Sequence, residues 1–363
     1  MAGSPRQGPL DHRLGLAHCA TMNTLWKHRA TALAAASIGA ALFWALHLPL
    51  PLLLGPMAGC LIFAVSGVRL AGMGMFGIVM RTFLGVVIGS AVTPELLREL
   101  PSYGPTLLAI PLFVLMIGAA GYPFFRKVMG FNHATSFYSA MPGGLQDMLI
   151  FGEEAGGDVR AMSLIHATRV LVIVAVVPFV LSYLYNLDLT RAPGVSASTM
   201  PVSQIAIMIA AGIVGWRLAE RVGLFGASIL GPLILSAILS LSGVIQSRPP
   251  AEMIWAAQFF IGIAVGSKYS GITAREIRVY IGAGLVYCAL LAIISIGFIW
   301  AIANLVTRNP LDLMLAFLPG GQAEMAVIAI VAHADVGFVV AHHLLRIFIV
   351  IISAPMIARI LRQ

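Results

Sequence analysis

Two copies of one polar block carry the residues of this chain that are best suited to chemistry. Each copy begins with a proline followed by two glycines, and the second copy lies 177 positions after the first. Proline removes a backbone donor and glycine relaxes the backbone, so each tripeptide should stop a helix. A stopped helix leaves free amide and carbonyl groups, and its N-terminal end can bind an anion. The residues of this predicted binding site are Pro142, Gly143, Gly144, Pro319, Gly320 and Gly321.

An acid follows each tripeptide at the same spacing, Asp147 in the first copy and Glu324 in the second. Ionisable residues within apolar segments are costly, and they commonly serve ion or proton pathways. We therefore expect Asp147 and Glu324 to coordinate a cation or exchange a proton. Two structural alternatives stay open: the tripeptides are simple kinks, and the acids cap the helices that follow.

A second recurring set consists of an aspartate, a histidine eight residues later and an arginine eleven residues later. On a helix these offsets place all three side chains on one face. The arginines could bind an anionic substrate or pair with the acids, and the histidines could relay protons. A structural polar network is the alternative, and capping is the expected role of the aspartates. The residues are Asp158, His166 and Arg169, and then Asp335, His343 and Arg346.

Other polar residues carry weaker signals. Arg81 has no basic equivalent in the second copy, where Gln258 takes its place, so we expect it to lie outside any two-fold core. The three cysteines have no metal or redox spacing, and no motif of a hydrolase, a zinc enzyme or a nucleotide-binding loop occurs. The sequence therefore predicts neither an enzyme nor a site for a metal or cofactor.

The elements that position these residues are apolar. Of the 363 residues, 60% are hydrophobic and 10% are charged, whereas a soluble domain has roughly a quarter of its residues charged. Apolar runs of the length that spans a bilayer recur from residue 31 onward, which predicts an all-α polytopic membrane protein. The net charge is +8, and the basic residues lie singly or in pairs between these runs, as in cytoplasmic loops, so we expect no nucleic-acid partner.

The repeats and the polar segments predict the domain organisation. Residues 1–24 are expected to be a disordered cytoplasmic tail, because the first apolar run follows the basic triplet at 27–29. A membrane repeat over 25–187, a linker over 188–200 and a second repeat over 201–363 should follow, with about six apolar segments in each repeat.

The two repeats can be parallel or inverted. If every segment crosses the membrane, the repeats are parallel; if one segment in each re-enters, they are inverted. The inverted arrangement places more of the loop Lys and Arg on the cytoplasmic side, because Arg160, Arg217 and Lys268 then join that set. The positive-inside rule therefore favours inverted repeats, with the Pro-Gly-Gly segments as broken helices or re-entrant segments.

The doubled block resembles the bacterial AbrB membrane protein family, which differs from the soluble DNA-binding regulator of the same name. The matching motifs read Met-Pro-Gly-Gly-Leu-x-Asp-Met and Leu-Pro-Gly-Gly-x-x-Glu-Met, each followed by Asp-Val and then by His and Arg. The resemblance covers about residues 30–360 and implies a duplicated module in the bacterial inner membrane. Family members have been labelled ammonia monooxygenase or regulator of gene expression. The block is more distantly similar to bile-acid/sodium symporters and cation–proton antiporters.

These observations predict a secondary transporter of a small anionic organic solute, coupled to H⁺ or Na⁺, with its site at the two Pro-Gly-Gly breaks. The expected partners are that solute, the coupling ion, the lipid bilayer and, in one alternative, a second copy of the chain. The alternative function is that of a non-transporting membrane regulator or scaffold protein.

Overall fold

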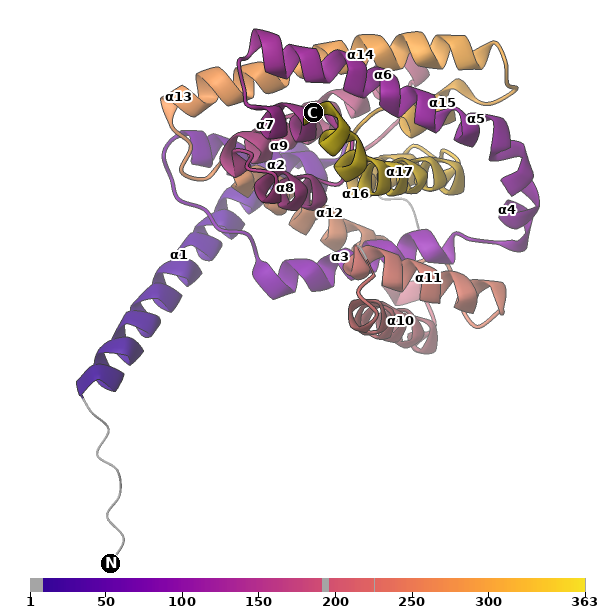
Figure 1. The fold of residues 1–363 in the computed structure, drawn as a ribbon. Coiled ribbons are helices and arrows are strands. Elements are labelled where there is room, and N and C mark those ends of the chain that lie inside the picture. The colour runs from indigo at the N-terminus through magenta and orange to yellow at the C-terminus, as the bar shows by residue number, and fades with distance from the viewer. Residues whose placement is uncertain (1–8, 191–195, 225, 363) are drawn as a thin grey trace, which may run out of the picture.

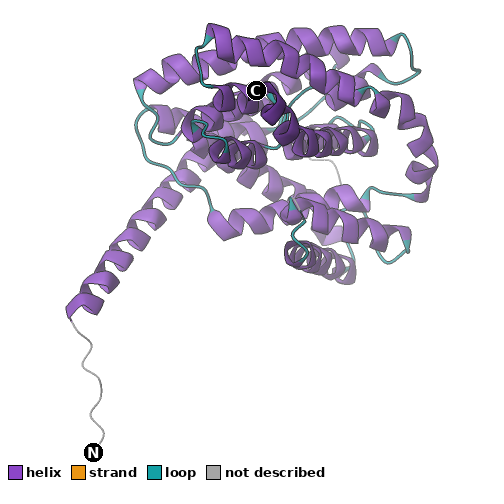
Figure 2. Cartoon of the chain, in the orientation of Figure 1, coloured by secondary structure: helices purple, strands orange, loops and turns teal. Residues whose placement is uncertain are grey.

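Helices are the regular secondary structure of this protein, and no strand occurs in the residues that the computed structural model describes, 9–190, 196–224 and 226–362 (Figure 2). Within these residues, five helical stretches are long and apolar enough to cross a membrane. They are Leu97–Val128, Val159–Tyr185, Val202–Arg221, Ala274–Ala303 and Val336–Ala358, and shorter apolar helices accompany them. The predicted all-α membrane architecture is confirmed.

The first half of the chain begins with the long helix α1, whose N-terminal part extends beyond the other helices (Figure 1). Its helices are α1 (Pro9–Ala45), α2 (Pro51–Val65), α3 (Gly74–Ser90), α4 (Pro94–Glu99), α5 (Gly104–Leu108), α6 (Ile110–Pro123), α7 (His133–Ala140), α8 (Leu145–Glu154) and α9 (Val159–Tyr185). Two other helical segments lie within this series, the 3-10 helix η1 (Leu100–Tyr103) between α4 and α5 and the π-helix η2 (Phe124–Val128) between α6 and α7.

The second half has a corresponding series. Its helices are α10 (Val202–Arg221), α11 (Ala227–Leu241), α12 (Ala251–Gly266), α13 (Ala274–Glu276), α14 (Gly282–Ala303), α15 (Pro310–Phe317), α16 (Gln322–Val331) and α17 (Val336–Arg362). Its short turns are η3 (Ala197–Thr199), η4 (Ser267–Tyr269) and η5 (Ile277–Ile281). The last three helices have 8, 10 and 27 residues, the same lengths as α7, α8 and α9.

The two halves interleave. Helix α2 packs against α12, and α3 packs against α11, so each pair joins a helix of the first half to one of the second (Figure 1). Helices α1, α2, α3, α10, α11 and α12 form one group, whereas α6, α14 and α15 pack with the long helices α9 and α17 in another. The repeats predicted over 25–187 and 201–363 are therefore consecutive in sequence but not separate in space.

Glycines allow the exchanged helices to approach closely. A Cβ atom at Gly85 or Gly89 would overlap the backbone of α11, at the carbonyls of Ile229 and Leu233. The corresponding glycines of α12 lie as tightly against the backbone of α2. Small residues at such spacing permit close helix contact in membranes, where apolar burial from water does not drive association. These glycines are packing residues.

The ends of the predicted domains differ in detail from the structure. Helix α1 begins at Pro9, within the stretch that we expected to be an irregular tail, and proline is favoured at the first position of a helix. Residues 1–8 lie outside the described residues. The linker predicted over 188–200 contains η3, and its residues 191–195 also lie outside the described ones.

We expect alanine at Gly89 and at Gly297 to change stability in opposite directions. Gly89→Ala should lower the free energy of unfolding by about 1–3 kcal/mol, because its methyl group overlaps α11. Gly297 lies in α14 with open space around its Cα, so Gly297→Ala should be neutral or stabilising by about 0.5–1 kcal/mol. Thermal unfolding of the detergent-purified variants measures both effects. Equal midpoints for the two variants would contradict the close packing of α3 on α11.

Candidate functional site

Both Pro-Gly-Gly segments interrupt their helices. Helix α7 ends at Ala140 and α8 begins at Leu145, while α15 ends at Phe317 and α16 begins at Gln322. The residues before α8 and α16, Gly144 and Gly321, are extended, with ψ of 137° and 140°. Each of these N-cap residues is a glycine, so it offers no side-chain cap to the helix that follows. The first backbone amides of α8 and α16 are therefore available to another acceptor.

Two buried arginines hold the carbonyl side of these breaks. Arg169 of α9 donates to the carbonyls of Met141 (3.2 Å) and Gly143 (3.3 Å). Arg346 of α17 donates in the same way to Leu318 (3.3 Å) and Gly320 (3.1 Å). The side chains are only 2% and 3% exposed. Non-helical backbone inside a membrane protein needs such internal partners, because lipid offers none.

The sequence left two roles open for these arginines beyond substrate binding, ion pairing with the acids or a structural network. In the described part of the chain, neither Arg169 nor Arg346 forms an ion pair with Asp147 or Glu324. Their terminal nitrogens contact the backbone of the breaks, as a structural network requires. Their Nε atoms are buried without a hydrogen-bond partner among the described residues.

The two histidines also contact backbone. His166 Nε2 lies 3.0 Å from the Tyr138 carbonyl, and His343 Nε2 lies 2.9 Å from the Leu315 carbonyl. Both side chains are fully buried. Among the described residues, neither hydrogen-bonds to the predicted coupling acids, so these contacts link α9 to α7 and α17 to α15. The proton-relay role stays a prediction.

The aspartates at the starts of the long helices are caps, as expected. Asp158 accepts a hydrogen bond from the amide of Ala161 at 3.0 Å, and Asp335 accepts one from Phe338 at 2.9 Å. Each second carboxylate oxygen accepts a tyrosine hydroxyl from the other half of the chain, Tyr280 onto Asp158 and Tyr103 onto Asp335. The caps therefore also join the two halves.

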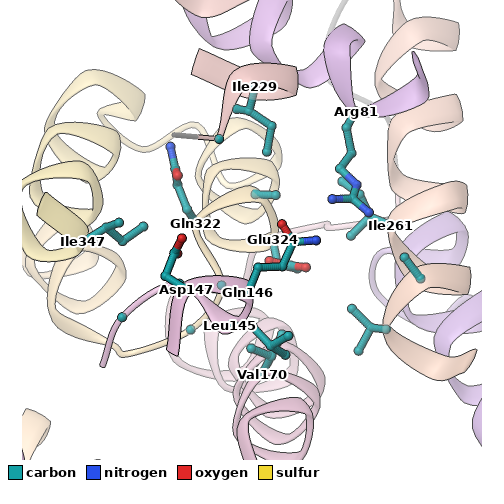
Figure 3. A pocket seen from close by; sticks show the side chains of 18 of the residues that line it. Arg81, Leu145, Gln146, Asp147, Val170, Ile229, Ile261, Gln322, Glu324 and Ile347 are labelled. Atoms are coloured by element: carbon teal, nitrogen blue, oxygen red, sulfur yellow. The ribbon is translucent and has the colours of Figure 1, made fainter. Parts of the chain in front are cut away.

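A cavity of about 260 Å³ lies between the two breaks (Figure 3). This volume is close to the lower end of ~300–1,000 Å³, the range of small-molecule sites in proteins. The predicted site residues that line it are Gly143, Gly144, Asp147, Arg169, Gly320, Gly321, Glu324 and Arg346. Neither proline nor either histidine belongs to the lining. The structure thus brings both acids and all four glycines to one cavity.

The acids extend from the first turns of the two short helices. Asp147 lies in the first turn of α8 and Glu324 in the first turn of α16, and both are half-buried. Figure 3 shows both carboxylates near Gln146 and Gln322 in the middle of the cavity. One carboxylate oxygen of Asp147 is buried without a hydrogen-bond partner among the described residues. An acid in this position stabilises the helix end and also faces the cavity, so capping and ligand binding are compatible.

Two cations that the sequence analysis did not assign to the site also line the cavity. Arg81 extends from α3 toward Glu324 (Figure 3). Lys268 lies in η4 after α12. We expected Arg81 to lie outside any two-fold core, and the positions equivalent to the two cations are the uncharged Gln258 and Ala91. A single arginine within an apolar run was the sequence feature that could have assigned Arg81 to the site.

We expect Arg169→Gln to destabilise the protein, because it removes two hydrogen bonds from a charged group to buried carbonyls. The expected loss is about 3 kcal/mol of the free energy of unfolding. Arg217→Gln is the matched control: its side chain is 58% exposed and pairs with Glu220, so the loss should stay below ~1 kcal/mol. Thermal unfolding in detergent compares the two. An equal, small loss in both would show that Arg169 does not support the break.

Comparison with known proteins agrees with the resemblance seen in the sequence. A family model described as "Transition state regulatory protein AbrB" matches residues 52–362, which include both breaks. A protein of Escherichia coli (strain K12), described as a candidate regulator AbrB, is 28% identical over 325 residues, 87% of this chain and 91% of that protein. The uncharacterized protein YhjN of Bacillus subtilis (strain 168) is 27% identical over 304 residues, 78% of each chain. The chain therefore belongs to the AbrB family.

Proposed function

We propose that this protein is a secondary transporter of a small organic anion, coupled to H⁺ or Na⁺, in the cytoplasmic membrane. The observation that carries the proposal is the cavity at which two interrupted helices, two acids and four glycines meet. In transporters, interrupted helices at corresponding places of two repeats commonly form the site for substrate and coupling ion. The proposal needs no resident metal or cofactor.

The backbone supplies one part of the proposed site. The N-termini of α8 and α16, which follow glycine N-cap residues, bring backbone amides and a partial positive charge to the cavity. Such helix ends bind anions without a basic side chain. The solute would therefore contact the region of Gly143, Gly144, Gly320 and Gly321. Pro142 and Pro319 would act by ending the preceding helices, since neither lines the cavity.

The acids supply the other part. Asp147 and Glu324 are the only acids of the cavity lining within the described residues. A carboxylate that faces a cavity in a membrane bundle can bind Na⁺ or take up a proton. We infer that Asp147 and Glu324 carry the coupling ion, whereas Arg169 and Arg346 hold the breaks open through their carbonyl contacts. Transport would then rock one helix group against the other around the cavity.

One observation favours a second function. The relative from Escherichia coli is described as a candidate regulator, which suits a non-transporting regulatory or scaffolding protein. Such a protein does not need a cavity lined by acids at two helix ends. Solute flux therefore separates the two functions.

We expect purified protein in proteoliposomes to accumulate organic acids only when a pH or Na⁺ gradient is imposed. Radiolabelled acetate, lactate, benzoate and succinate cover small mono- and dicarboxylates. Asp147→Asn and Glu324→Gln should each abolish gradient-driven flux, because a neutral amide cannot exchange a proton and binds Na⁺ weakly. Counterflow without a gradient should persist if the acids serve coupling rather than solute binding.

Glu153→Gln is the matched control for these variants. Glu153 lies on α8 as Asp147 does, but it is exposed and outside the cavity, so its loss should leave flux unchanged. Absence of gradient-dependent flux for the whole panel would favour the regulatory alternative. Unchanged coupling in the double variant of Asp147 and Glu324 would exclude the acids from the mechanism.

A further inference from the structure

Two cations line the cavity without a hydrogen-bond or ion-pair partner among the described residues. Arg81 is half-buried on α3, and Lys268 is exposed in the turn after α12. Neither makes a hydrogen bond or an ion pair with any residue that the structure describes. The positive charge of Arg81 acts unfavourably on Lys268 and favourably on Glu324. Arg81, Lys268 and Glu324 line the same cavity, and Arg81 is close enough to the other two for its charge to act on both.

Unpaired like charges at one cavity are unfavourable in a surrounding of low dielectric constant, unless an anion lies between them. The other two arginines of the lining are less suited to bind such an anion. Arg169 and Arg346 already donate to the carbonyls of the breaks, and only their Nε atoms lack a partner. The free cationic charge of the cavity thus lies with Arg81 and Lys268.

The positive charge of Arg81 and Lys268 has no counterpart at the equivalent positions of the sequence. The positions equivalent to the two cations in the other half are Gln258 and Ala91, which are uncharged. The lining close to Arg81 includes the apolar Ile229 and Ile261, and Val170 and Ile347 lie farther along it (Figure 3). A ligand that satisfies both surfaces has an acidic group at one end and a hydrocarbon body at the other. The cavity volume of about 260 Å³ restricts this ligand to a small molecule.

We propose that Arg81 and Lys268 form the subsite that binds the acidic group of an organic anion with an apolar body, and that cation binding at Glu324 strengthens it. This inference rests on the proposed transport function for the direction of coupling, but the subsite itself is a property of the cavity. With both acids ionised, Arg81 and Lys268 are offset by Asp147 and Glu324. With both acids neutralised by bound cations, the free cations attract an anion, so anion and coupling ion favour each other's binding.

The electrostatic potential in the cavity can be measured without knowing the ligand. Ser228, on α11, lines the same cavity and is partly exposed. Ser228→Cys, in a protein whose three native cysteines are replaced by serine, provides one reactive thiol. The probes are two methanethiosulfonates, one with a sulfonate and one with a trimethylammonium group. The ratio of the sulfonate rate to the trimethylammonium rate reports the local charge. A change in the intrinsic reactivity of the thiol affects both rates equally and therefore leaves this ratio unchanged.

We expect the thiol at 228 to prefer the sulfonate reagent. Arg81→Gln and Lys268→Gln should each lower the rate ratio about tenfold, because each removes one nearby positive charge. Glu324→Gln should raise the ratio, since it mimics the neutralised acid. Arg81→Lys should keep the ratio of the parent, which separates charge from altered packing. Arg248→Gln is the control, because Arg248 lines a separate cavity at the other end of α11.

The outcome separates this inference from the proposed function. A ratio that Arg81→Gln and Lys268→Gln both leave unchanged would overturn the subsite, even if organic acids are transported. A ratio that depends on both cations, together with no flux in proteoliposomes, would retain the anion subsite and reject transport. If flux is present, 4-methylbenzoate should compete with it better than acetate does, and both cation variants should raise the concentration needed for half-maximal competition.

Discussion

The backbone of the two helix breaks is the constraint on which the rest of this structure depends. Four residues between α7 and α8, and four between α15 and α16, lie outside the helices in a bundle of apolar helices. Lipid cannot satisfy their polar groups, so the protein must do so itself. Arg169 and Arg346 provide this through their guanidinium groups, and the histidines one turn earlier bind the ends of the preceding helices.

The same arrangement determines what remains available to a ligand. The carbonyl side of each break is occupied by an arginine, whereas α8 and α16 begin after a glycine that offers no side-chain cap to their amides. The breaks also contact the long helices crosswise: Gly143 lies against Val350 of α17, and Gly320 lies against Ile173 of α9. Each break is thus held between both long helices. Rigid support on one side and free amides on the other make a preorganised cavity.

The backbone features of this cavity recur in both halves of the chain, whereas its free positive charges do not. The helix breaks, their arginine contacts and the aspartate caps all recur 177 positions apart. Arg81 and Lys268 have no such counterparts, so the free positive charge lies on one side. The helix breaks, arginine contacts and caps are therefore paired between the two halves, whereas the positive charge of the cavity lining is not. This combination suits an elongated ligand with one acidic end better than a symmetric one.

The sequence by itself determined the features that depend on neighbouring residues. Pro142 and Pro319 ended helices, Asp158 and Asp335 capped them, and the eight- and eleven-residue spacings placed the histidines and arginines on one helix face. Only the tertiary structure decided which partners those side chains have. Arg169 meets carbonyls rather than Asp147, and Arg81 meets Glu324, because the interleaving of α3 and α12 with the other half brings distant segments together. Such contacts depend on long-range packing, which local periodicity does not specify.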